Sequence, residues 1–351
     1  MKISKLIAVA FLSVFLTASC SKDDETIVQK ALFEDGFFIL NEGSASQGSI
    51  SFLSNDLSSF TANAYTAANP NDLMGKFAQS IFFSGDNAYI IAGGSNKINV
   101  VNRFTLKLIA KIETGLKNPR YGVVKDGKAY VTNANTYSTD NPVSGNTDDY
   151  IAVINLANNT IEATIPLNAT ADKLAINNEK IYIIESYNNS NVLVYNTVSS
   201  TLETPIAIGA DANSLEINNG FLYILRAPYG VEGQLVKINL TSNLVSTINL
   251  PIAQTDAKNL DIEGSKIYYT QDANVFAMDI YATVAPTAKL FSYTSTSLYG
   301  KMYGFAVKND RVYIADAGNF SDNGTAYIYS LTGVLLKEKV VEVGPNGFYF
   351  N

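Results

Sequence analysis

Short apolar strands recur along the chain, and each follows a polar turn and carries an aromatic residue near its start. Neighbouring copies of this aromatic are 41 to 52 residues apart, and the seven positions are Phe38, Tyr89, Tyr130, Tyr182, Tyr223, Tyr268 and Tyr313. A strand-rich repeat of about 40–50 residues is typical of a β-propeller. We therefore predict an all-β fold, a seven-bladed β-propeller of four-stranded antiparallel blades.

The third copy shows the strands of one blade most clearly. Residues 119–124 form the predicted inner strand, and the turn that follows contains Asp126-Gly127, a pair typical of tight hairpins. The second strand is predicted at 129–132 and the third at 150–155. Apolar and polar residues alternate at 161–165, as in an outer strand with one solvated face.

The two ends of the chain complement each other. The copy around Phe38 has no inner strand of its own, whereas residues 345–350 remain after the last copy ends near Val343. We predict that this C-terminal strand joins the N-terminal blade and closes the ring, which leaves no exposed sheet edge at the seam. Residues 32–351 are then a single propeller domain.

The N-terminus has the pattern of an export signal. Lys2 and Lys5 precede an apolar stretch at 6–16, which is too short to span a bilayer. Residues 16–20, Leu-Thr-Ala-Ser-Cys, resemble a bacterial lipobox, and 21–25, Ser-Lys-Asp-Asp-Glu, resemble the surface-export signal of Bacteroidetes lipoproteins. We predict a signal peptide at 1–19, a lipidated Cys20 with a short tether at 20–31, and a cell-surface position on the outer membrane. The alternative is an ordinary signal peptide with an incidental cysteine.

Composition excludes several kinds of chemistry. The chain has 25 Lys and Arg against 32 Asp and Glu, a net charge of −7, which argues against nucleic acid as a partner. It contains no His, so Ser-His-Asp triads and His-ligated metals are excluded. The single cysteine rules out intramolecular disulfides. No cofactor is expected.

Long, dissimilar loops join the second and third strands, at 41–49, 133–149, 185–191, 226–234 and 316–325. In a four-stranded blade these loops lie on the same face as the starts of the inner strands, and variable loops on a rigid scaffold commonly bind ligands. Solvated loops without a ligand are the alternative. The predicted ligand-binding residues are Lys76, Gln79, Arg120, Tyr121, Tyr137, Lys173, Tyr187, Asn213, Tyr229, Lys258, Asn259, Tyr303 and Asn346.

Five cations lie at or near the inner-strand starts: Lys76, Arg120, Lys173, Lys258 and Lys301. As a ring in an acidic protein, they would attract a phosphate or carboxylate group. The alternative is that they pair with neighbouring acids such as Asp172 and Asp256, or are hydrated.

No catalytic or metal-binding motif stands out. Paired carboxylates for hydrolysis would have to come from Glu42, Asp172, Glu185, Asp272 and Asp316. Carboxylates in polar loops are more often solvated or part of turns, so we predict a protein that is not an enzyme, with a carboxylate-based hydrolase or lyase as an alternative. Asp140, Asp148 and Asp149 in the longest loop lack EF-hand spacing, and we predict no metal site; a site for a hard cation such as Ca²⁺ in this loop is the alternative.

Residues 128–133, Lys-Ala-Tyr-Val-Thr-Asn, together with 151–166, resemble the YncE-like seven-bladed propellers. Residues 38–43 and 78–80 resemble a Bacteroidetes surface-lipoprotein branch of that family, the BtuG-like branch. This resemblance implies capture of a small nutrient such as cobalamin or another corrinoid, and its delivery to a TonB-dependent transporter in the outer membrane. The alternative is a scaffold or adhesion propeller that binds protein or glycan.

Overall fold

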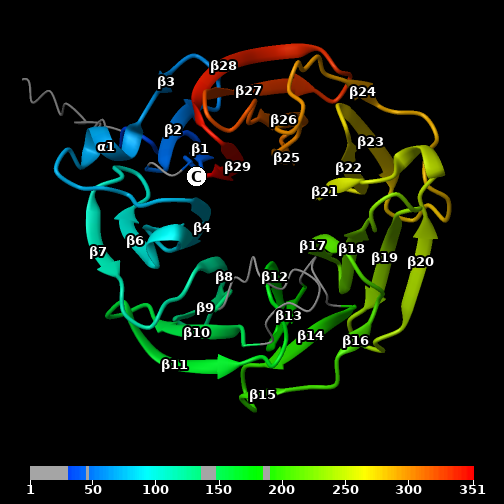
Figure 1. Ribbon diagram of the computed structural model, residues 1–351, viewed down its shortest axis with the longest axis horizontal. Coiled ribbons are helices and arrows are strands. Elements are labelled where there is room, and N and C mark those ends of the chain that lie inside the picture. Colours follow the sequence, from blue (N-terminus) through cyan, green and yellow to red (C-terminus); the bar gives the residue numbers. More distant parts are fainter. Residues whose placement is uncertain (1–30, 45–46, 136–147, 185–189) are drawn as a thin grey trace, which may run out of the picture. The chain divides into compact units, whose positions relative to one another are not determined.

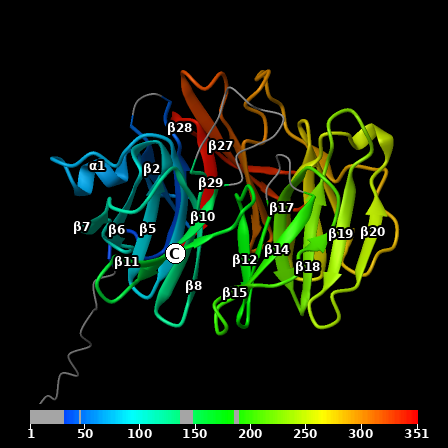
Figure 2. The same ribbon diagram turned by 60° about the horizontal axis from the view of Figure 1, so that its bottom comes forward.

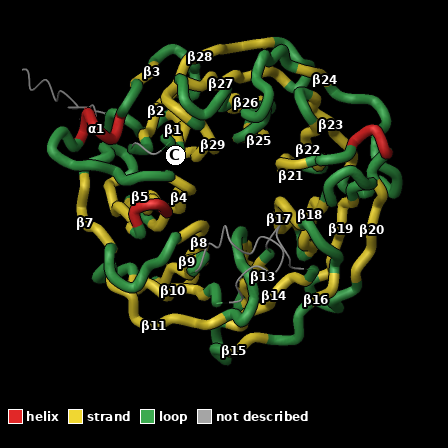
Figure 3. Tube along the Cα trace, viewed as in Figure 1, coloured by secondary structure: helices red, strands yellow, loops and turns green. Residues whose placement is uncertain are grey.

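The computed structural model describes residues 31–44, 47–135, 148–184 and 190–351. In this part of the chain, residues 31–351 form one compact unit of seven antiparallel sheets arranged as a ring (Figure 1). The predicted seven-bladed propeller is confirmed. Figure 3 shows how little of the described part of the chain is helical: it contains α1 (Ala64–Ala68) and two short 3-10 turns at Gly93–Ser95 and Ile252–Gln254.

In each blade the first-named strand lies at the centre of the ring and the last-named strand lies at the rim. Blade one contains β29 (Pro345–Phe350), β1 (Gly36–Asn41), β2 (Ser49–Ser54) and β3 (Phe60–Thr61), and blade two contains β4 (Ala78–Ser84), β5 (Asn87–Ala92), β6 (Lys97–Asn102) and β7 (Leu108–Ile112). Blade three contains β8 (Pro119–Lys125), β9 (Lys128–Asn133), β10 (Tyr150–Asn155) and β11 (Thr160–Pro166). Blade four contains β12 (Leu174–Asn177), β13 (Lys180–Ile183), β14 (Asn191–Asn196) and β15 (Thr201–Leu202), and β16 (Ile206–Ala207) also pairs with β14.

The remaining blades follow the same order. Blade five contains β17 (Ala212–Asn218), β18 (Phe221–Arg226), β19 (Gln234–Asn239) and β20 (Val245–Asn249). Blade six contains β21 (Lys258–Glu263), β22 (Lys266–Gln271), β23 (Asn274–Asp279) and β24 (Phe291–Ser292). Blade seven contains β25 (Gly304–Lys308), β26 (Arg311–Asp316), β27 (Asn323–Ser330) and β28 (Leu335–Val343).

All seven repeated aromatics lie on the second strands of their blades and are buried. Each sheet has side chains on both faces, so neighbouring blades pack face to face and share a core. In one such core the ring of Phe82 stacks on Tyr89 at 4.8 Å, and both belong to the cluster that includes Val131 and Ala152 of the next blade. The repeated aromatic residues therefore lie in the cores that pack each blade against the next.

The C-terminal strand closes the ring, as predicted. β29 pairs with β1 in antiparallel register, with Phe37 opposite Phe350 and Ile39 opposite Phe348. The rings of Phe348 and Phe350 pack on Tyr313 of blade seven at 5.5 and 5.0 Å. The two chain ends of the propeller therefore lie in one sheet.

The strands of blade three lie where the sequence placed them, and the turn at Asp126-Gly127 has positive φ at both residues, 48° and 74°, as the hairpin requires. Two features were not predicted. The outer strands β3, β15 and β24 contain only two residues each. The link from β3 to β4 contains α1, which buries Tyr65 in the core.

The two faces of the ring differ in their connections. We call the face where the inner strands begin the loop face, and the face with the first and third hairpin turns of each blade the turn face. Backbone bonds from Gly48 N to Gly75 O (2.8 Å) and from Ala78 N to Glu42 O (3.0 Å) show that a second-to-third loop and an inner-strand start share the loop face. Figure 2 shows the ring from a second direction. No helix within the described ranges is long and apolar enough to cross a membrane.

Candidate ligand-binding site

Five inner strands contain extra residues close to their starts. Asn346, Gln79 and Asn213 each have no partner on the second strand of their own blade. The pairing register also shifts at Arg120-Tyr121 and at Asn259-Leu260. Such β-bulges leave a residue outside the regular pairing and redirect its side chain, and they are common beside functional sites. All but Leu260 were predicted as ligand-binding residues, so the bulges bring these predicted residues together around the loop-face end of the central channel, which we call the mouth.

Hydrogen bonds connect these side chains from one blade to the next. Asn346 Nδ2 donates to Ala78 O at 2.8 Å, which joins blades one and two. Gln79 Nε2 donates to Tyr121 Oη at 2.9 Å, and Arg120 Nη1 donates to Gln79 Oε1 at 2.6 Å, which joins blades two and three. These residues therefore hold the ring together as well as line the mouth.

The same pattern continues around the ring. Arg120 Nε lies 3.0 Å from Asp172 Oδ1, between blades three and four. Lys173 Nζ donates to Asn213 O at 2.8 Å, and Asn213 Nδ2 donates to Ala257 O at 2.9 Å. Between blades six and seven, Asn259 Nδ2 donates to Met302 O at 2.7 Å and Lys258 Nζ donates to Lys301 O at 3.0 Å. The last described link runs from the Tyr303 hydroxyl to Glu42 of blade one.

The five cations differ in their partners. Arg120 pairs with Asp172, and Lys301 Nζ pairs with Asp272 Oδ1 at 2.8 Å. Lys173 and Lys258 instead bind backbone carbonyls, and burial lowers the pKa of both ammonium groups. Lys76 is exposed. The mouth therefore contains two half-buried amines bonded to neutral groups. Arg120 is the cation at the bulges that pairs with an acid.

Glu42 and Tyr303 form the acidic part of the mouth. Burial raises the pKa of the Glu42 carboxyl, although the Tyr303 hydroxyl and the charge of Arg120 act in the opposite direction. Burial beside Glu42 also raises the pKa of Tyr303, so this phenol stays protonated and donates. Asn346 Oδ1 is buried and has no hydrogen-bond partner within the described ranges. Because this oxygen is closed to solvent, the acceptor positions that the mouth offers are those of Glu42 beyond the one filled by Tyr303.

The remaining carboxylates considered for hydrolysis are held by donors. Asp316 is buried, and although burial raises its pKa, the hydroxyls of Ser295, Ser297 and Tyr293 and the amide of Gly318 hold it below its usual range. With Asp172 and Asp272 paired to cations, these acids serve to join neighbouring segments.

The possible calcium ligands are only partly described. Asp149 is buried and accepts from the amides of Asn135 (3.0 Å) and Ala171 (2.8 Å), and burial raises its pKa to about 6. Asp148 accepts from Asn135 Nδ2 at 3.0 Å. No group of three or more acidic, His or Cys side chains within the described ranges is placed to hold a metal. Cys20, Tyr137, Asp140, Glu185 and Tyr187 lie outside the described residues.

The loop face also has exposed apolar side chains. Tyr229, which was predicted from the sequence, is 92 % exposed on the loop between β18 and β19, and the others were not predicted. The others lie on that loop or on links between blades: Leu73, Phe77, Val231, Ile252, Leu298 and Tyr299. Isolated apolar residues in loops give no periodic signal, so only the structure shows that they share a face.

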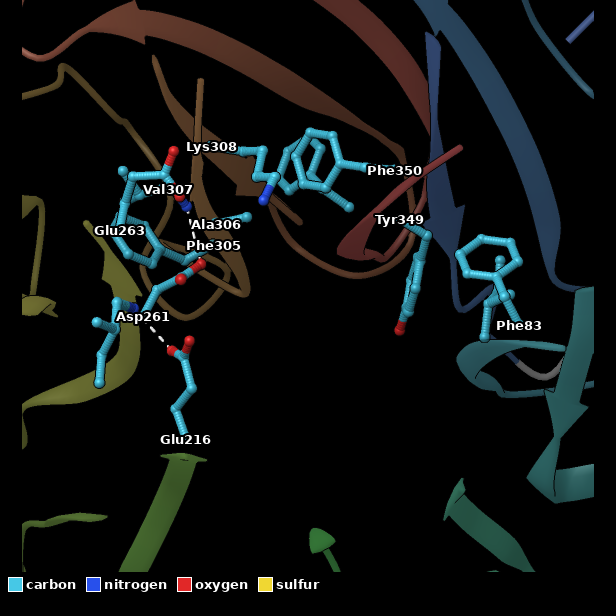
Figure 4. Close-up of a pocket in the computed structure, with 13 residues that line it drawn as sticks. Phe83, Glu216, Asp261, Glu263, Phe305, Ala306, Val307, Lys308, Tyr349 and Phe350 are labelled. Carbon is cyan, nitrogen blue, oxygen red and sulfur yellow. Dashed lines mark hydrogen bonds between the residues drawn. The ribbon is translucent and has the colours of Figure 1, made fainter. Parts of the chain in front are cut away.

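A second unpredicted feature is a cavity of about 530 Å³ in the half of the channel nearer the turn face (Figure 4). Glu216, Asp261 and Glu263 lie on its β17 and β21 side, and Phe83, Tyr349 and Phe350 belong to β4 and β29. The sequence does contain one indication of this cavity, because Glu216 and Asp261 are acidic residues at corresponding positions of two inner strands. The bulged residues of the mouth lie nearer the strand starts.

These features define a class: a seven-bladed β-propeller with a polar, hydrogen-bonded channel mouth under a loop-bearing face. The chain belongs to the family described as "Domain of unknown function (DUF5074)", whose model matches residues 35–312. Among proteins with curated descriptions, none matches this sequence.

Solved structures share the fold at low sequence identity. A quinoprotein alcohol dehydrogenase-like protein from Bacteroides thetaiotaomicron superposes with a TM-score of 0.68 at 16 % identity, over 91 % of this chain and 78 % of its own. The periplasmic gluconolactonase PpgL of Pseudomonas aeruginosa gives 0.65 at 12 % identity, over 90 % and 98 %. BamB from Moraxella catarrhalis gives 0.53 at 15 % identity, over 91 % and 87 %. At such identities the likeness is one of fold alone.

Proposed function

We propose that this protein is a non-enzymatic binding protein that captures a small nutrient molecule at the mouth of the channel. The observation that carries the proposal is the set of bulges, which collect polar side chains from five blades at one place. β-Bulges are common beside functional sites, and these bulges place hydrogen-bonding groups from separate blades around one channel.

The groups at the mouth favour a ligand with both acceptors and donors. Lys173 and Lys258 each show one hydrogen bond, to a backbone carbonyl, and an ammonium group has three donors. A phosphate or carboxylate oxygen is a suitable partner for the remaining donors. The Glu42 carboxylate, which accepts from the Tyr303 hydroxyl and offers about four acceptor positions, would accept from an amide or hydroxyl of the same ligand.

A corrinoid is the ligand we propose first. The resemblance to the BtuG-like branch supports it, and cobalamin carries peripheral amides and one phosphate, which match the two kinds of group at the mouth. The lipobox-like segment before Cys20 supports a lipid-anchored position on the cell surface. A protein at that position would hand its ligand to a TonB-dependent transporter of the outer membrane.

Isothermal titration of the purified protein with cyanocobalamin and with cobinamide, which lacks the phosphate, tests the ligand. We expect saturable heat at micromolar cobalamin and weaker binding of cobinamide. Lys173→Ala and Lys258→Ala should each weaken cobalamin about ten-fold or more, because a hydrogen bond to a charged group contributes about 1.5–3 kcal/mol. Lys266→Ala, at an exposed position on the turn face, is the control. Absence of heat with both compounds removes the corrinoid proposal.

The apolar side chains of the loop face favour a second candidate, a scaffold or adhesion propeller that binds a protein or glycan. Adjacent exposed apolar residues are typical of interaction surfaces, although the turn face also has exposed apolar side chains such as Val198 and Leu244. Leu298 and Tyr299 are 84 % and 81 % exposed on the link from β24 to β25. Leu298→Ser with Tyr299→Ser would weaken a macromolecular partner and leave a small ligand at the mouth unaffected, whereas Lys173→Ala would do the reverse.

A further inference from the structure

The cavity near the turn face differs chemically from the mouth. Its volume of about 530 Å³ is within the range of small-molecule sites, and its lining comes from blades one, two, five, six and seven. Glu216 and Asp261 lie on one side of the space and Tyr349 and Phe83 on the other (Figure 4). The cavity therefore places carboxylates opposite aromatic rings.

The carboxylates on the first side lack a matching number of cations. Glu216, Asp261 and Glu263 line the cavity, and Lys308 is the one cationic residue among its described lining residues. Glu216 Oε2 accepts from Ile262 N at 2.7 Å, and Asp261 Oδ2 accepts from Val307 N at 2.8 Å. Since a carboxylate offers about four acceptor positions, the one or two backbone amides at each of these groups leave positions unfilled.

The pKa values of Glu216 and Asp261 are raised, in keeping with the excess of acids over cations in the cavity. Burial, then the charges of Asp261 and Glu263, raise the pKa of Glu216 to about 8, against the Ile262 amide and the charge of Lys308. Burial raises the pKa of Asp261 to about 6, and the charge of Glu263 adds to it, while two backbone amides and Lys308 oppose it. A second cation in the cavity would stabilise the ionised forms.

The aromatic side offers the surface that an organic cation needs. Tyr349 and Phe83 line the cavity. Arg103 already lies over the ring of Phe83, 4.0 Å from its centroid, so that ring holds a cation of the protein itself. Tyr349 is the ring facing Glu216 and Asp261 without such a partner among the described contacts (Figure 4).

We propose that this cavity is a second ligand site, distinct from the mouth, and that it binds a small organic ammonium between the carboxylates of Glu216 and Asp261 and the ring of Tyr349. The carboxylates supply the charge, and the ring supplies a cation–π contact and an apolar surface. Binding favours the ionised form of Glu216, so uptake of the cation releases a proton near neutral pH.

Titration with choline tests the proposal, because its charge does not change with pH. Isothermal calorimetry is run in two buffers of different ionisation enthalpy, and 3,3-dimethyl-1-butanol serves as the neutral analogue of the same shape. We expect saturable choline binding, an observed enthalpy that depends on the buffer, and affinity that rises from pH 6 to pH 8.5. The neutral analogue should bind at least ten-fold more weakly.

Two pairs of variants locate the site. Glu216→Gln keeps an oxygen for the Ile262 amide and should weaken choline about ten-fold, whereas Lys308→Gln removes the competing cation and should tighten it, a gain that misfolding would not produce. Tyr349→Leu should weaken choline several-fold, and Tyr349→Phe, which keeps the ring, should not. Lys173→Ala at the mouth should leave choline affinity unchanged.

Three results would overturn the proposal. One is the absence of saturable choline binding, and another is equal affinity for the neutral analogue. The third is choline affinity that stays the same in both Glu216→Gln and Lys308→Gln, with melting curves showing that both variants are folded.

Discussion

Truncation after Gly347 tests whether the seam between β1 and β29 holds the propeller closed. The deletion removes Phe348, which is buried, and Phe350, which packs on Phe37 and Tyr313. It also removes Asn351, whose side chain donates to Phe33 O and, at 3.0 Å, to Arg103 O. The first ring alone stabilises a core by about 3–5 kcal/mol. The partly buried second ring and the hydrogen bonds add roughly 3 kcal/mol more.

We therefore expect the free energy of unfolding to fall by about 6–8 kcal/mol. An unfolding entropy near 2.1 cal/mol/K per residue gives a domain of this size a decrease in melting temperature of roughly 10 °C. The assay is thermal unfolding followed by circular dichroism, with urea unfolding of the same samples. Tyr229→Ala removes an aromatic that is 92 % exposed, and it should change the melting temperature by no more than about 1 °C. A truncated protein that melts within about 2 °C of the parent would refute the seam as the closing element.

Three further predictions concern the channel and the blade cores. Gly122→Ala should lower the free energy of unfolding by about 1–3 kcal/mol in urea, because the new Cβ would lie 2.7 Å from the ring of Phe82, which is stacked on Tyr89. Arg120→Ala should lower the free energy of unfolding by about 1.5–3 kcal/mol by leaving the half-buried Asp172 unpaired, and adding Asp172→Asn should recover part of that loss. Equal stability of the single and double variants would contradict the pairing. The pKa of Glu216 is about 8 in the folded protein against the usual 4.5, so the folded state holds a proton that the unfolded state has lost, and stability is greatest below this pH window. The free energy of unfolding should fall by about 3–4 kcal/mol between pH 5 and pH 8, and the melting temperature by roughly 5 °C, a slope that Glu216→Gln should flatten.

The fold could be predicted from the sequence because each blade repeats the same local signals. The turn at Asp126-Gly127 and the buried Tyr130 that follows recur as equivalents in the other blades, so strand order and closure follow from the period. The prediction failed in segments that do not share the repeated pattern. The short outer strands and α1 lie where the chain runs over the surface, and packing there is decided by contacts distant in sequence.

The site could be predicted only as a set of positions. The inner-strand starts are correct for Gln79, Arg120 and Asn346, but a bulge depends on which residue the neighbouring strand skips, and sequence does not encode that locally. The pairing of Arg120 with Asp172 depends in the same way on how two blades face each other. The ligand-binding role itself, for these residues and for those outside the described ranges, stays a prediction.

Closure by the last strand also sets the order in which the molecule can be made. All six residues of β1 are buried in the finished ring, yet their partner β29 leaves the ribosome roughly 300 residues later. At about 5–20 residues per second, the roughly 300 residues between them take about 15–60 s to synthesise. Throughout that interval an apolar strand has one open edge, the form of backbone most prone to aggregate. The nascent chain therefore needs protection at β1 until β29 has been synthesised.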